Sequence, residues 1–223
     1  MRAEGSAAVA ANAPPMRVYL ARHGETTWNR EGRYQGRRES ELTERGAQQA
    51  HALAGAIATT GVQRVISSPM LRCTATAQPS AQRSNLPVET DDRLIEIAHG
   101  TWEGLLRDEI AANDPERYRA WREDPAHVAF DGGESLAQVL ERWRAFRAAL
   151  RGDGPVLVVT HDAVVRVGLV DIAGTHLSTF WDWNVENGAY AVLDATETGW
   201  TIVEQRANAH LAGLRAPIEG QAL

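Results

Sequence analysis

The segment Val156–Thr160 is the feature that most constrains the fold, because its valine and leucine side chains follow one another without polar alternation. Continuous runs of this kind are typical of central parallel strands that are covered on both faces. Two shorter β-type runs, 17–21 and 62–66, are each followed by a turn and a helical segment. Strand and helix therefore alternate, which predicts an α/β fold with three layers, α/β/α, around a mainly parallel sheet.

Apolar side chains recur at helical spacing in several of the remaining segments. They predict helices over 43–60, 70–81, 136–150 and 163–173, with Thr43 as an N-cap and Pro69 in the first turn of the second helix. Two further β-type runs, 189–193 and 200–203, predict a hairpin around 196–199. The segment 105–132 mixes prolines, aromatic residues and charges, so we expect short helices there that form a small cap.

The 223 residues, 43% of them apolar, suit one ordinary globular domain over 16–223. Residues 1–15 are rich in alanine and lack a usable period, so we expect a disordered leader. The single cysteine, Cys73, cannot form an internal disulfide, and no secretory leader is visible, which predicts a cytoplasmic protein. No stretch approaches the roughly 20 apolar residues needed to span a bilayer, so no membrane association is expected.

The net charge of −6 opposes general attraction to nucleic acid or anionic membranes, so a small molecule is the expected partner. All 23 basic residues are arginines. Without lysine the chain has neither a P-loop lysine for nucleotide phosphates nor an amine for a Schiff base with pyridoxal phosphate. The sequence permits a homodimer and specifies no oligomeric state.

Side chains suited to a phosphate follow three of the predicted strands. Arg22-His23 follows the first strand, Ser67-Ser68 and then Arg72 follow the second, and His161 follows the third. In open α/β sheets, ligands bind beyond the carboxyl ends of the strands, where these groups would converge. Arginine forks hold phosphate oxygens well, so we predict that Arg22 and Arg72 bind a phosphate that faces His23 and His161.

Short motifs succeed one another along the chain: Leu20–Thr26, Trp28-Asn29, Tyr34–Gly36, Leu42–Gly46, Ser67–Ala77, Arg93–Ile97, Gly100–Gly104 and Thr160–Asp162. In this order they resemble the histidine phosphatase superfamily, in its phosphoglycerate mutase-like branch, and specifically its small bacterial phosphatases. The resemblance covers nearly the whole chain from Met16.

The resemblance implies a phosphomonoester phosphatase that works through a phosphohistidine and needs neither metal nor cofactor. His23 would be the nucleophile, and Glu96 would protonate the leaving group and later assist the attacking water. Arg22, Arg72 and His161 would stabilise the phosphoryl group. The substrate would be a small phosphate ester whose identity the sequence does not specify.

The resemblance also implies that further residues contact the phosphate or the substrate, namely Gly24, Thr26, Asn29 and Gln35. Asp162 stands where many members carry glycine. It could orient His161, contact the substrate or cap the following helix, and the helix cap is the role that we expect. In the predicted cap, we expect Trp121 to line the pocket, while Arg122 and His127 would contact substrate or lie in a solvated loop.

Two other functions share these motifs. A mutase-type phosphotransferase would use the same phosphohistidine, but the long mutase-type insertion is absent and Gly100–Gly104 looks like the phosphatase form. A non-catalytic scaffold would usually lack a catalytic residue, whereas all five are present. A cysteine-phosphatase loop at Cys73 is excluded, because the required arginine six positions later is Pro79.

Overall fold

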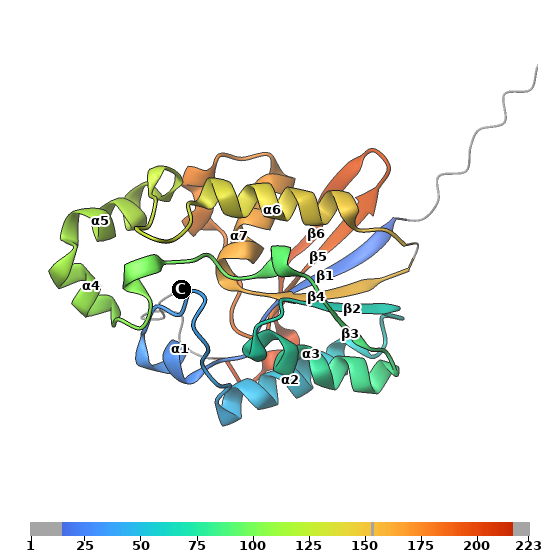
Figure 1. Cartoon of the computed structure of the whole chain (residues 1–223). Coiled ribbons are helices and arrows are strands. Elements are labelled where there is room, and N and C mark those ends of the chain that lie inside the picture. Colours follow the sequence, from blue (N-terminus) through green and yellow to red (C-terminus); the bar gives the residue numbers. More distant parts are fainter. Residues whose placement is uncertain (1–14, 153, 216–223) are drawn as a thin grey trace, which may run out of the picture.

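The computed structural model describes residues 15–152 and 154–215, and in that part of the chain six strands form one sheet (Figure 1). The strands, in the spatial order β3-β2-β4-β1-β5-β6, have these bounds: β1 (Met16–Arg22), β2 (Arg64–Ser67), β3 (Val88–Thr90), β4 (Val156–Thr160), β5 (Tyr190–Thr196) and β6 (Gly199–Ala207). Strands β3, β2, β4 and β1 are parallel, and β5 and β6 continue the sheet antiparallel. The predicted mainly parallel sheet is confirmed, with the apolar run Val156–Thr160 inside it.

The three central strands end at the same edge of the sheet. In the register of the sheet, Arg22 of β1 lies opposite Thr160 of β4, and Val159 of β4 lies opposite Ser67 of β2. The next residues along the three strands are His23, Ser68 and His161.

Helices cover both faces of the sheet (Figure 1), which confirms the three layers. Their bounds are α1 (Thr27–Glu31), α2 (Glu44–Ile57), α3 (Leu71–Ser84), α4 (Arg107–Asn113), α5 (Pro115–Glu123), α6 (Leu136–Ala149) and α7 (Asp162–Ala173). Short 3-10 helices lie at η1 (Asp92–Leu94), η2 (Gly100–Trp102), η3 (Pro125–His127), η4 (Leu177–Asp182) and η5 (Ala209–Leu211).

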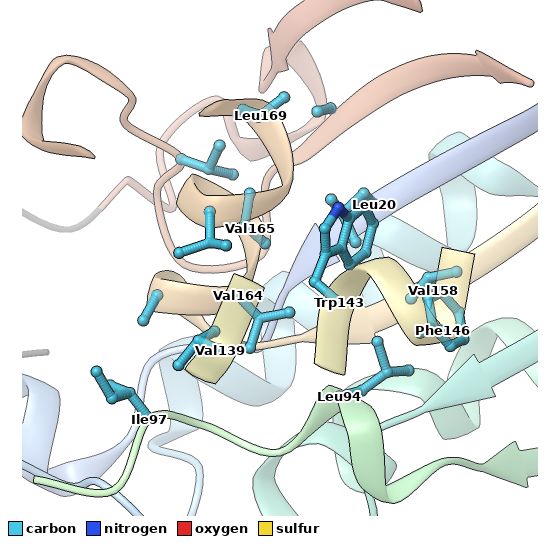
Figure 2. Close-up of a cluster of buried hydrophobic side chains, with 14 of the residues drawn as sticks. Leu20, Leu94, Ile97, Val139, Trp143, Phe146, Val158, Val164, Val165 and Leu169 are labelled. Carbon is cyan, nitrogen blue, oxygen red and sulfur yellow. The ribbon is translucent and has the colours of Figure 1, made fainter. Parts of the chain in front are cut away.

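The sheet has an apolar core on each face because side chains alternate along its strands. From β1, Val18 and Leu20 join the core formed with α6 and α7, whereas Tyr19 and Ala21 join the core formed with α2 and α3. Figure 2 shows Trp143 of α6 packed in the first of these cores. These cores fix the central strands, and with them the residues at their ends.

Several predicted boundaries shift in the structure. Thr43 caps α2 as predicted, accepting a hydrogen bond from the Gly46 amide. Pro69 does not lie in the first turn of α3, which begins at Leu71 after the N-cap Met70. The elements α1 and β3 were not predicted, because they have five and three residues, too few to show a period.

The segment 105–132 forms α4, α5 and η3, in agreement with the short helices predicted there. Its role as a cap stays a prediction. The prediction that Trp121 lines the pocket is wrong, because the side chain is fully buried against Phe130 and Trp181. The guanidinium carbon of Arg122 lies 4.2 Å from the centroid of the Trp181 ring. On the surface, His127 Nδ1 lies 2.9 Å from Asp124 Oδ2.

The predicted leader falls almost entirely outside the described residues. Within residues 15–152 and 154–215, no helix combines the length and the apolar composition that crossing a membrane requires.

Candidate active site

Two histidines meet at the shared edge of the central strands. The rings of His23 and His161 lie with centroids 5.3 Å apart and at 68° to each other, and both side chains are buried. The backbone fixes His23, since its amide donates to the Thr160 carbonyl at 2.9 Å and its carbonyl accepts from Gly188 at 3.1 Å. The convergence predicted from the strand ends is therefore present.

The environment of His23 suits a nucleophile. Its Nδ1 lies 2.7 Å from the carbonyl oxygen of Gly24, which can only accept, so Nδ1 carries the proton and Nε2 keeps a lone pair. Burial, with the positive charges of Arg72 and Arg22, holds the pKa of His23 well below its usual value. The imidazole is therefore neutral at neutral pH, with Nε2 available for attack.

Arg72 is held by the backbone of a neighbouring loop. Its two terminal nitrogens donate to the carbonyl oxygens of Gly36 and Arg38 at 2.8 and 2.9 Å, and the side chain is buried. Its Nε has no acceptor among the described residues. A fixed, buried guanidinium with an unused donor is suited to an anion such as a phosphate.

Arg22 is held by Asp162. The Arg22 Nη1 lies 2.9 Å from Asp162 Oδ1, and the other carboxylate oxygen of Asp162 accepts from Arg166 Nε at 2.6 Å. The expected helix-cap role of Asp162 is wrong, because the N-cap of α7 is His161 and Asp162 is the first helical residue. From the first turn of α7, the Asp162 side chain forms ion pairs with the buried side chains of Arg22 and Arg166.

Glu96 lies in the loop after η1 and is almost fully buried. The Ile97 amide donates to its Oε1 at 2.9 Å. Burial raises the pKa of Glu96 to about 7, although Arg72 and this amide act in the opposite direction. A carboxyl group that still holds a proton near neutral pH is suited to general acid catalysis.

His161 contacts Ser68, which follows β2, and Cys73, which lies in α3. Its Nε2 lies 2.8 Å from Ser68 Oγ and 3.4 Å from Cys73 Sγ. Burial, with Arg72 and His23, holds the pKa of His161 well below its usual value, so this ring is also neutral at neutral pH. The hydroxyl of Ser67 instead donates to the Ser68 carbonyl at 2.8 Å.

The other predicted binding residues lie together beside His23. Thr26 Oγ1 lies 3.0 Å from Asn29 Oδ1 and 3.0 Å from Gln35 Oε1, and all three side chains are buried. Asn187, which the sequence did not indicate, donates to the carbonyl of His23 and to Asn29 Oδ1. Among the described residues the amide nitrogens of Asn29 and Gln35 have no acceptor, so they are available to a ligand.

Gly24 is required for packing. Its amide donates to Thr76 Oγ1 at 3.0 Å, and a Cβ at this position would lie 2.5 Å from the Gly46 carbonyl oxygen. Since the amide already has a protein partner, phosphate binding by Gly24 stays a prediction.

A cavity of about 570 Å³ adjoins Arg72. It is lined by Thr27, Trp28, Glu39, Ser40, Glu41, Leu42, Leu71, Arg72 and Ala75. His23, His161 and Glu96 do not line this cavity. The cavity therefore borders the catalytic residues and does not enclose them.

No group of three or more histidine, cysteine or acidic side chains is placed to hold a metal ion in the part of the chain described by the structure. Metal independence of the reaction stays a prediction.

A model of the histidine phosphatase superfamily (branch 1) matches residues 18–208. This chain belongs to the histidine phosphatase superfamily. The predicted family is therefore confirmed, over most of the chain.

Relatives and solved structures agree with this membership. This histidine phosphatase is 38% identical to phosphoserine phosphatase 1 of Hydrogenobacter thermophilus, covering 88% of this chain and 94% of that protein. It is 30% identical to the adenosylcobalamin/alpha-ribazole phosphatase of Escherichia coli, covering 82% and 91%. Its fold matches the structure of Bacillus stearothermophilus YhfR with a TM-score of 0.84 and 28% identity, covering 88% and 99%.

The ion pairs of Asp162 lead to a stability prediction for this histidine phosphatase. Asp162→Asn leaves two buried arginines without their negative partner, so we expect the free energy of unfolding to fall by about 3 kcal/mol. Urea denaturation measures the change. Asp194→Asn is the control, because its pair with Arg17 is partly exposed and should contribute less than about 1 kcal/mol. Equal losses in the two variants would contradict a special role for Asp162.

Proposed function

We propose that this chain hydrolyses small phosphomonoesters through a phosphohistidine formed on His23. The observation that carries the proposal is a neutral His23 whose Nε2 is available, held at one sheet edge with two arginines. Glu96, whose pKa is about 7, supplies the proton that an alkoxide leaving group needs.

In the first step, His23 Nε2 attacks phosphorus and the bond between phosphorus and the ester oxygen breaks. Glu96 transfers its proton to the departing oxygen, so that the product leaves as an alcohol. Arg22, Arg72 and His161 face the phosphoryl oxygens, where charge must be stabilised in phosphoryl transfer. The product of this step is a phosphohistidine and an ionised Glu96.

In the second step, water attacks the phosphohistidine. Ionised Glu96 accepts a proton from this water, and the bond between nitrogen and phosphorus breaks. Inorganic phosphate leaves, His23 returns to its neutral form and Glu96 is again protonated. Each group therefore regains its starting state without an external cofactor.

The named relatives support hydrolysis. They include a phosphoserine phosphatase, an alpha-ribazole phosphatase and, at 36% identity, glucosyl-3-phosphoglycerate phosphatase of Mycobacterium tuberculosis. A probable phosphoglycerate mutase of Erwinia tasmaniensis shares 29%. The mutase alternative is thus less well supported, and the presence of all five predicted catalytic residues opposes the scaffold alternative.

The proposal includes a cytoplasmic location and excludes nucleic acid as substrate. The net charge of −6 and the single, buried cysteine support these points. The homodimer stays a prediction.

The proposed function is tested by phosphate release in the presence of excess chelator. A panel of O-phosphoserine, glycerol 3-phosphate, glucose 6-phosphate and a mononucleotide is incubated with the protein and EDTA. We expect at least one ester to be hydrolysed at an unchanged rate, because arginines and histidines supply the positive charge and the hydrogen bonds of the site. Activity that is lost with EDTA and restored by a divalent metal would contradict the mechanism.

A further inference from the structure

Arg37 lies next to the arginine that is proposed to bind phosphate. The carbonyl oxygens of Gly36 and Arg38, on either side of it, both accept from the guanidinium of Arg72. The backbone of Arg37 is therefore fixed beside Arg72 by two hydrogen bonds.

The side chain of Arg37 extends from this position to the predicted acid. Its Nε lies 3.5 Å from the carbonyl oxygen of Glu96, and its Nη2 lies 2.8 Å from Glu134 Oε1. Its Nη1 has no acceptor among the described residues. With 46% of its side chain exposed, Arg37 lies at the surface between Arg72 and Glu96, both of which are buried.

The charges around Arg37 leave it incompletely neutralised. Glu134 is shared, since it also pairs with Arg142 at 3.2 Å, so one carboxylate faces two guanidinium groups. Glu103 Oε1 accepts from the backbone amides of Arg37 and His99. Burial favours the neutral form of Glu96 below about pH 7, against the opposing charge of Arg72. A further anion can therefore bind the free edge of Arg37.

The turn just before Arg37 has a backbone conformation that favours glycine. Gly36 has a φ of 51°, in the left-handed region, and a Cβ there would lie 2.1 Å from Glu103 Oε1. Both features favour glycine at position 36, and they define the backbone turn that leads into Arg37.

We propose that Arg37 binds a carboxylate carried by the substrate close to its ester oxygen. This inference rests on the proposed function, in which Glu96 protonates that oxygen. A substituent on the adjacent carbons then comes next to Arg37, because Arg37 contacts the backbone of Glu96 itself. The planar edge of a guanidinium matches a carboxylate. The substrate class is therefore phosphorylated hydroxy acids.

Two esters that differ only at the carboxylate test this inference. In 3-phosphoglycerate a carboxylate replaces the hydroxymethyl group of glycerol 3-phosphate. We expect the wild type to favour 3-phosphoglycerate in kcat/KM by at least about 10-fold, and Arg37→Gln to lower this ratio by about 10- to 100-fold. Since Arg37 also contacts Glu96, some loss with both esters is expected, and only the ratio isolates the carboxylate. Arg37→Lys should restore part of the preference.

Arg83→Gln is the matched control, because Arg83 is an exposed arginine at the far end of α3. It removes the same charge and should leave the ratio unchanged. A wild-type ratio near one, or a ratio that Arg37→Gln does not change, would overturn the inference while leaving the proposed function intact.

If neither ester is hydrolysed, their binding affinities still test the role of Arg37. Calorimetry on His23→Ala and on His23→Ala/Arg37→Gln compares the affinities for the same two esters. Tighter binding of 3-phosphoglycerate that disappears in the double variant supports Arg37 even if the proposed hydrolysis fails. Equal affinities for both esters in His23→Ala would overturn it.

Discussion

Replacing His23 by alanine is expected to lower kcat for every phosphate ester by about 10⁴-fold or more, because the nucleophile itself is removed. Wild-type protein mixed with substrate labelled on phosphorus and quenched in alkali should carry the label. This phosphoprotein should be acid-labile, as a phosphohistidine is, and His23→Ala should not form it. The measurement is retained radioactivity together with initial rates.

His51→Ala is the control for this prediction, because His51 is an exposed histidine on α2. It should keep the rate and the phosphoprotein of the wild type. Label retained by His23→Ala would place the nucleophile on another residue, and His161, the other histidine at the sheet edge, would be the next to test.

Glu96→Gln is expected to slow the hydrolysis of alkyl phosphates by about 10²- to 10⁴-fold, because the amide cannot donate a proton to an alkoxide. The effect should be much smaller with p-nitrophenyl phosphate, whose leaving phenolate is stable without a proton. Initial rates on the two ester types measure the difference. An unchanged rate with an alkyl phosphate would remove Glu96 from the acid role.

The pH dependence gives the same residue a second test. The acid form of Glu96 exists below its pKa of about 7, so kcat/KM for alkyl phosphates should fall as the pH rises through this value. Glu96→Gln should lack this decrease. Glu204→Gln, on exposed β6, should show the wild-type profile. A decrease of the same shape in Glu96→Gln would assign it to another group.

Local sequence patterns were sufficient for the central sheet and for the residues at its edge. The unbroken run Val156–Thr160 can be satisfied only by burial on both faces, which requires neighbouring strands and helices. The turn residues after β1, β2 and β4 then bring His23, Ser68 and His161 to one edge. Once the three parallel strands are recognised, the positions of their carboxyl ends are known, so the convergence of these three residues was predictable.

Short elements and side-chain partners were less accessible to sequence reasoning. Strand β3 has two half-buried residues and one exposed residue at the sheet border, so it shows no apolar pattern. The prediction for Trp121 was wrong because its sequence neighbours are mostly charged, which suggested an exposed position. In the structure Phe130 and Trp181, the second of which is distant in sequence, pack against its ring.

The sequence by itself therefore determined the α/β fold, the family and the catalytic candidates, because periodicity and motif spacing are local properties. Only the tertiary structure decided what Asp162 and Arg37 contact. Asp162 pairs with Arg22, 140 positions earlier in the chain, and Arg37 reaches Glu96 in a different loop. Such pairings depend on how distant segments pack against one another, and no local pattern encodes that geometry.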